Sequence, residues 1–197
     1  MNEKKVIQIN IPRPNIQLLT IRIKGTAPLI FHKWSEKAKK MMLDKQMKVA
    51  NKGREIRNPE QEYKDSYYYN SENKISIPAI SIKQAMVGAA RNIEGVTMTL
   101  LRGAIFVVGD KDGLIPLTYK EERMRTDTVT VGMRGADLRF RGEVIDWETK
   151  FVIKYNADVL SAAQVINLLA IAGFACGIGE WRPEKNGDKG TFEVVSE

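Results

Sequence analysis

The chain has 197 residues, of which 43% are hydrophobic and 28% are charged. This composition excludes a disordered chain and suits one domain, residues 1–197, with a sizeable core. The 31 Lys and Arg residues outnumber the 24 Asp and Glu residues, which gives a formal charge of +7. Such a basic surplus favours polyanionic partners, nucleic acid or anionic lipid among them.

The sequence predicts no disulfide, no metal site and no cofactor. Cys176 is the only cysteine, so neither an internal disulfide nor a cysteine-based zinc site can form. Asp110 and Asp112 have the pattern of a turn rather than of a metal site. No apolar run approaches the roughly 20 residues of a membrane span. We therefore expect a cytoplasmic protein that neither spans nor binds a membrane.

The first half of the chain predicts two strands, one basic helix and a second helix. Apolar and polar residues alternate over 17–25, which predicts a strand. Ser35 is expected to cap a Lys-rich helix that runs to about residue 50, and 51–74 form the least regular stretch. A short strand ends at Pro78, after which Ser81 is expected to cap a helix over 82–93.

The second half predicts three strands, a hairpin and a long helix. Short strands are expected at 103–108, 147–155 and 191–195. A hairpin over 129–141 would turn at the glycines of 132–135, and the helix over 159–174 is apolar nearly all round. The principal order is strand, helix, strand, strand, helix, strand. It predicts an α+β, ferredoxin-like (RRM-like) βαββαβ palm with a basic helical insertion at about 33–78 and a thumb-like β-hairpin insertion at about 109–145.

The turn from Gly177 to Gly190 combines glycines, cations and one aromatic side chain. Glycines let backbone N–H groups approach a phosphate closely, and tryptophan can stack on a base. This pattern predicts nucleic-acid contacts by Gly177, Gly179, Trp181, Arg182, Lys185 and Lys189. The alternative is a helix C-cap followed by an exposed loop.

An Arg-rich segment, 121–143, is the second candidate for strand binding. Guanidinium groups pair with phosphates and stack on bases. The predicted contacts are Arg123, Arg125, Arg134, Arg139 and Arg141, with Arg139 and Arg141 on one face of the hairpin. The alternative is a solvated hairpin in which Asp127, Asp137 and Glu143 neutralise part of this charge.

Two further features favour structural roles. The lysines of the helix over 36–50 are most simply a solvated face, although a basic helix can also bind a partner. The cluster Tyr67-Tyr68-Tyr69 could stack on bases, but alternation along the chain favours core packing.

Three segments together resemble the RAMP superfamily, which includes the backbone subunits of CRISPR effector complexes. These are Thr20–Leu29, Ile75–Ala85 and the glycine-rich turn between the last helix and the last strand. Gln84 stands where the family usually has glycine. The resemblance implies single-stranded RNA or DNA bound across the palm and self-association along the strand. A stand-alone chain of this kind looks like an accessory protein of a phage or mobile element.

His32, the only histidine, carries the alternative enzymatic hypothesis. Some RAMP-type endoribonucleases use a histidine in the loop after the first strand, which implies metal-independent RNA cleavage by His32. Subunits that cut target RNA use an aspartate there, and no Asp or Glu occurs between Gly25 and Ser35. We therefore expect a non-catalytic, single-strand-binding protein. A third possibility is an interaction protein that mimics or inhibits a CRISPR-type complex.

Overall fold

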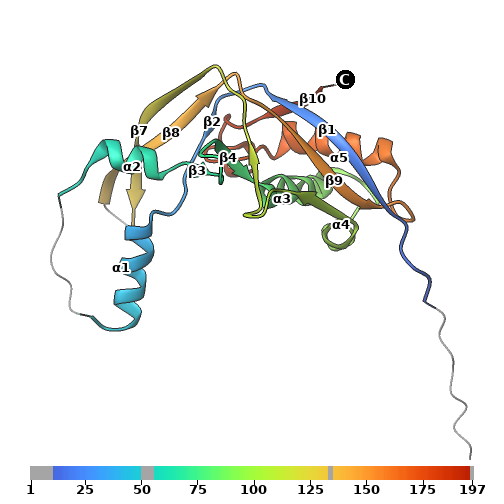
Figure 1. Ribbon diagram of the computed structural model, residues 1–197, viewed down its shortest axis with the longest axis horizontal. Helices are drawn as coiled ribbons and strands as arrows, with labels where there is room; N and C mark the ends of the chain where they lie inside the picture. Colours follow the sequence, from blue (N-terminus) through green and yellow to red (C-terminus); the bar gives the residue numbers. More distant parts are fainter. Residues whose placement is uncertain (1–10, 50–55, 133–134, 196–197) are drawn as a thin grey trace, which may run out of the picture.

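The largest element of the fold is a four-stranded antiparallel sheet. The structure is a computed structural model that describes residues 11–49, 56–132 and 135–195. The strand order is β10 (Phe192–Val195), β1 (Ile16–Gly25), β9 (Glu148–Asn156) and β5 (Ile105–Val108). Helices α3 (Ala79–Ala89) and α5 (Ala162–Ala175) contact each other beneath this sheet (Figure 1). The predicted α+β class is therefore confirmed.

The two faces of the sheet have different surroundings, because side chains alternate along each strand. Ile21 and Ile23 of β1 and Ile153 of β9 are buried in the core that includes α3 and α5. Trp147, just before β9, is fully buried and lies edge-on to Phe192 at 6.3 Å between ring centroids. On the opposite face, Leu18, Lys154 and Phe106 lie side by side in register and are exposed. This second face is open to a ligand.

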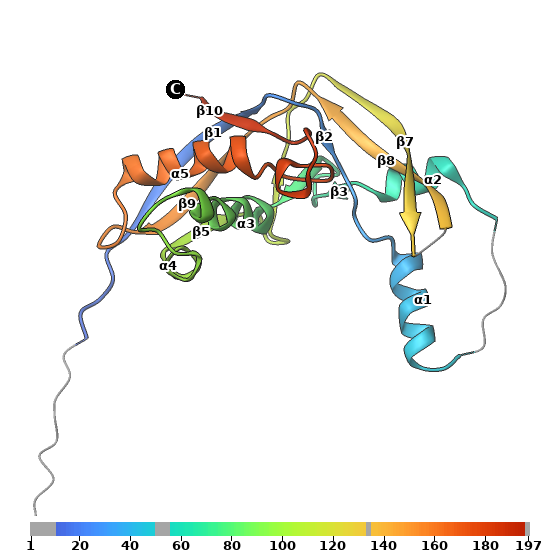
Figure 2. The same ribbon diagram turned by 180° about the vertical axis from the view of Figure 1, so that it is seen from behind.

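A hairpin arm extends from one end of the sheet (Figures 1 and 2). Strands β7 (Glu121–Val131) and β8 (Gly135–Ile145) form the arm, and β2 (Leu29–Ile30) pairs with β8 at its base. Helix α2 (Pro59–Asp65) packs on the arm, and neither α2 nor α1 (Glu36–Gln46) has a buried residue. A third sheet joins β3 (Tyr68–Tyr69), β4 (Ile75–Pro78) and β6 (Leu114–Pro116) in that order. Because β7 begins at Glu121 and β8 ends at Ile145, the hairpin is longer than the predicted 129–141.

The end of α1 and the start of α3 differ from the prediction. Ser35 caps α1 as expected, through a 3.2 Å hydrogen bond from the amide of Ala38, but α1 ends at Gln46. Helix α3 begins at Ala79, three residues before the predicted start. Ser81 is not its cap, because its hydroxyl lies inside the first turn and donates to the carbonyl of Pro78 at 2.6 Å.

Short helices are the elements that the sequence pattern did not predict. Asn58 caps α2 and Pro59 occupies its first turn, which is a typical helix start within the stretch predicted to be irregular. Helix α4 (Met98–Ala104) takes up the beginning of the predicted strand 103–108. Helix α5 begins after Ser161, which forms a capping box with Gln164, rather than at 159. Seven-residue helices give too few turns for periodicity to reveal them.

Candidate nucleic-acid interface

The glycine-rich turn from Gly177 to Gly190, called the clasp below, is tightly folded. Most of its backbone amides donate hydrogen bonds within the protein. The amides of Ile178 and Gly190 donate to the carbonyls of Gly190 and Pro28, and that of Glu180 donates to Ile30. Gly179 has φ of +77°, and a Cβ there would lie 2.5 Å from the carbonyl oxygen of Ile30. The glycines are therefore required for the fold of the turn itself. A phosphate would have to compete with backbone carbonyls for these amides.

The cations of the turn differ in their availability. Arg182 donates to Glu184 and to the carbonyl of Gly179, so it stabilises the turn from within. Lys189 lies 3.2 Å from Asp188 and is mostly covered, whereas Lys185 is exposed. Trp181 is 40% exposed and its indole N–H donates to Asp127 of the hairpin at 3.4 Å. The turn and the hairpin arm are thus joined.

The hairpin arginines form an ion-pair network with carboxylates of the same two strands. Arg123 and Arg125 contact Glu143 at 2.6 and 3.4 Å, and Arg125 also contacts Asp127 at 2.6 Å. These carboxylates help to raise the pKa of Arg125 above its usual value, and the hydrogen bond that Arg125 donates to Asp127 is the largest cause. Asp127 and Glu143 therefore neutralise part of the arginine charge, as the alternative of a solvated hairpin predicted.

Two other arginines of the predicted set are paired as well, and one is not described. Arg139 contacts Asp137 at 3.2 Å. Arg141 is buried against Asp127 at 3.1 Å, so its side chain is not accessible to a nucleic-acid strand. Arg134 lies outside the described residues. Among the described arginines of this set, Arg123 has the most exposed side chain, at 53%.

His32 lies between the clasp and the base of the hairpin arm. Its Nδ1 atom is 2.8 Å from a carboxylate oxygen of Glu180, and both side chains are more than one-third exposed. The hydrogen bond with His32 holds the pKa of the Glu180 carboxyl below its usual value, although burial opposes this shift. When Nδ1 of His32 carries a proton, it donates this hydrogen bond to the Glu180 carboxylate, and Nε2 takes no part in the contact. This pairing was not visible in the sequence, since 148 residues separate the two side chains.

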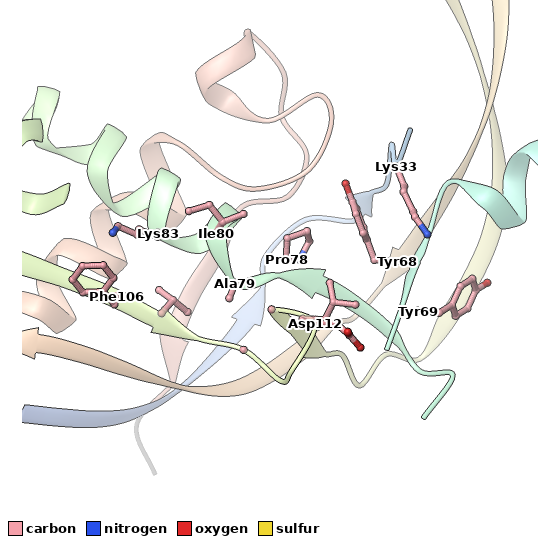
Figure 3. A pocket seen from close by; sticks show the side chains of 13 residues that line it. Lys33, Tyr68, Tyr69, Pro78, Ala79, Ile80, Lys83, Phe106 and Asp112 are labelled. Atoms are coloured by element: carbon pink, nitrogen blue, oxygen red, sulfur yellow. The ribbon is translucent and has the colours of Figure 1, made fainter. Parts of the chain in front are cut away.

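A groove of about 690 Å³ lies beside the start of α3 (Figure 3). Two pairs of side chains, each a lysine next to an aromatic ring, line it. The Lys83 ammonium is 3.8 Å from the centre of the Phe106 ring, and that of Lys33 is 5.8 Å from the centre of the Tyr68 ring. Pro78 and Ile80 lie between these two pairs in the view. Asp112 is the only acidic residue in the lining.

The groove combines aromatic rings with lysine ammonium groups. Phe106 is 51% exposed, and burial lowers the pKa of Lys83, whose ammonium donates to the carbonyl of Arg102 at 2.9 Å. Aromatic faces stack on bases and ammonium groups neutralise phosphates. Lys83 and Phe106 were not among the predicted contacts. The one available signal was the alternation of β5, in which Ile105 points inward and Phe106 outward.

The tyrosine cluster is divided between core and groove. Tyr67 is 1% exposed and packs edge-on against Phe31 at 5.0 Å between ring centroids, as core packing predicted. Tyr68 and Tyr69 instead line the groove.

No three potential metal ligands gather anywhere in the described residues. None of the described helices has the length and apolar character of a membrane span.

Comparison with solved structures finds chains with a similar fold. One match is a chain in the structure "Cryo-EM structure of the Type III-B Cmr-beta bound to cognate target RNA", with a TM-score of 0.52 and 12% identity. It covers 92% of this chain and 59% of that chain, so our chain spans less than two-thirds of that subunit. Cmr6 from Pyrococcus furiosus also matches, with a TM-score of 0.44, 12% identity, and coverage of 92% and 99%.

Searches at the level of sequence find no counterpart. No family model matches the chain, and neither does any curated protein. The resemblance predicted from the three segments agrees with the fold of the matching chain in the type III-B Cmr-beta structure.

Proposed function

We propose that this protein binds single-stranded nucleic acid, RNA foremost, without cutting it. The observation that carries the proposal is the groove with its two lysine–aromatic pairs, Lys83–Phe106 and Lys33–Tyr68. A single strand offers both phosphates and unstacked bases to such a surface, whereas the bases of a duplex are stacked and paired. The formal charge of +7 supports the same ligand class.

The four-stranded sheet acts in this proposal as a ferredoxin-like palm, and the hairpin arm as a thumb. The strand order β10-β1-β9-β5 supports this assignment, as does the position of β7 and β8 between β5 and β9 in the chain. A bound strand would pass over the open face near Phe106. The exposed Lys185 of the clasp and Arg123 of the arm would contact its phosphates. Self-association along the strand remains a prediction from the family resemblance.

Anisotropy of a labelled single strand tests this function. The protein is first freed of bound nucleic acid by nuclease treatment, and binding is measured at low and raised salt. We expect binding that weakens steeply with salt, because phosphate contacts release counterions.

A second candidate function is metal-independent RNA cleavage, which the 2.8 Å contact between His32 and Glu180 favours. A carboxylate that orients an imidazole prepares the ring to take up a proton from a ribose hydroxyl. The non-catalytic proposal predicts that labelled RNA stays intact in EDTA with wild type and with His32→Ala, and that both proteins bind it equally. Cleavage by wild type that is lost in His32→Ala would establish the enzyme instead.

A further inference from the structure

The groove contains a carboxylate that the fold itself does not use. Asp112 lies in the turn 110–113 between β5 and β6 and lines the groove. The sequence predicted a turn role for both aspartates, but only the Asp110 side chain has it. One of its carboxylate oxygens accepts the amides of Asp112 and Leu114, each at 2.9 Å. The exposed carboxylate of Asp112 forms no hydrogen bond or ion pair with any residue that the structure describes.

The turn holds the backbone of Asp112 in a fixed place. The amide of Gly113 donates to the carbonyl of Asp110 at 2.9 Å, and the carbonyl of Gly113 accepts the amide of Ala79 at 2.8 Å. The second bond joins the turn to the first residue of α3, the helix that carries a lysine of the groove. A side chain on so well fixed a backbone can recognise a ligand by its geometry.

A free carboxylate does not suit a phosphate at the same place. Lys33 and Lys83 supply the cations of the groove, and Asp112 lies between Phe106 and Tyr69 in the view of Figure 3. Because like charges repel, the part of a bound strand that faces Asp112 is a base rather than a phosphate. That base must offer N–H donors, since an ionised carboxylate only accepts hydrogen bonds.

We propose that Asp112 selects a guanine base of the bound strand, an inference that rests on the proposed single-strand function. The two carboxylate oxygens match the ring N1–H and the amino group that lie side by side on the Watson–Crick edge of guanine. Adenine and cytosine offer an amino group beside a ring nitrogen that is itself an acceptor. The N–H of uracil lies between two carbonyl oxygens, which repel a carboxylate. In a single strand this edge is free to be read.

Anisotropy with short labelled RNA strands tests the proposal. Each strand consists of uridine except for one central nucleotide, which carries guanine, hypoxanthine, adenine or cytosine, and a fifth strand is uridine throughout. We expect wild type to bind the guanine strand about tenfold more tightly than the uridine strand, within the range of a bidentate base contact. The hypoxanthine strand should lie between them, because this base keeps the ring N–H but lacks the amino group.

Three variants assign the preference to the carboxylate. Asp112→Asn should abolish the preference without weakening the binding of the uridine strand, because an amide offers only one acceptor oxygen. Asp112→Glu keeps the carboxylate and should retain part of the preference. Asp65→Asn is the matched control, since it removes the same charge from an exposed residue of α2 outside the groove lining. It should discriminate between the strands as wild type does, and thermal unfolding checks that each variant is folded.

Equal affinities of wild type for all five strands would overturn the selection of guanine and leave the single-strand function intact. A guanine preference that survives Asp112→Asn would do the same, as would tighter binding of the adenine or cytosine strand. Absence of binding to every strand would contradict the single-strand function itself, and this inference with it.

Discussion

Phe106→Ala is expected to weaken the binding of single-stranded RNA by roughly 1–3 kcal/mol, or about 5- to 150-fold, if one base stacks on this ring. The ring is half-exposed beside the Lys83 ammonium, so its loss removes a stacking surface without opening the core. Lys83→Ala should weaken binding too, and should also flatten its dependence on salt, because it removes a cation rather than a π-face.

Phe174→Ala is the matched control for this prediction. It is the same substitution at an exposed aromatic residue, but on α5, away from the groove lining. We expect its affinity for RNA to equal that of wild type. Equal affinities for Phe106→Ala, Phe174→Ala and wild type, measured by anisotropy on folded proteins, would show that the groove does not bind the strand.

Gly190→Ala is expected to destabilise the protein by about 3 kcal/mol or more, because the clasp closes on itself at this residue. A Cβ at this position would lie 1.8 Å from the carbonyl oxygen of Ile178, in a backbone conformation with φ of +65°. Relief of that clash would break the hydrogen bonds from Ile178 to Gly190 and from Gly190 to Pro28. Urea unfolding followed by circular dichroism measures the loss.

Gly95→Ala separates the clash from the backbone conformation. Gly95 has φ of +76°, but nothing lies within 4 Å of its added Cβ. Its substitution should cost only about 1–2 kcal/mol, the strain of a left-handed residue with a side chain. Similar losses for the two variants would mean that the clasp yields easily, in contradiction to a tightly folded turn.

The sequence predicted the elements whose residue pattern is set by local backbone geometry. The alternation of β1 and the apolar residues of α5 predicted both elements, because each periodicity follows directly from backbone geometry. The same periodicity did not show that α5 is buried on one side only. Burial depends on which elements pack against a helix, and Phe174 is apolar yet exposed.

The candidate site could be predicted only in part, for a reason of the same kind. The cations of the turn and hairpin are visible in the sequence, but their partners are not. Arg141 meets Asp127 across a strand pair, and His32 meets Glu180 across most of the chain. The groove likewise unites Lys33, Lys83 and Phe106, which come from separate parts of the chain. Long-range pairing of this kind is set by topology rather than by spacing.

The proposed function requires that the protein bind a single strand through its phosphates and bases. The most direct measurement is the anisotropy of a labelled single-stranded RNA titrated with nuclease-treated protein at several salt concentrations, with duplex as competitor. We predict an affinity whose logarithm falls linearly with the logarithm of salt concentration, and weak competition by duplex. Absence of binding at low salt, or competition by duplex as strong as by single strand, would contradict the account.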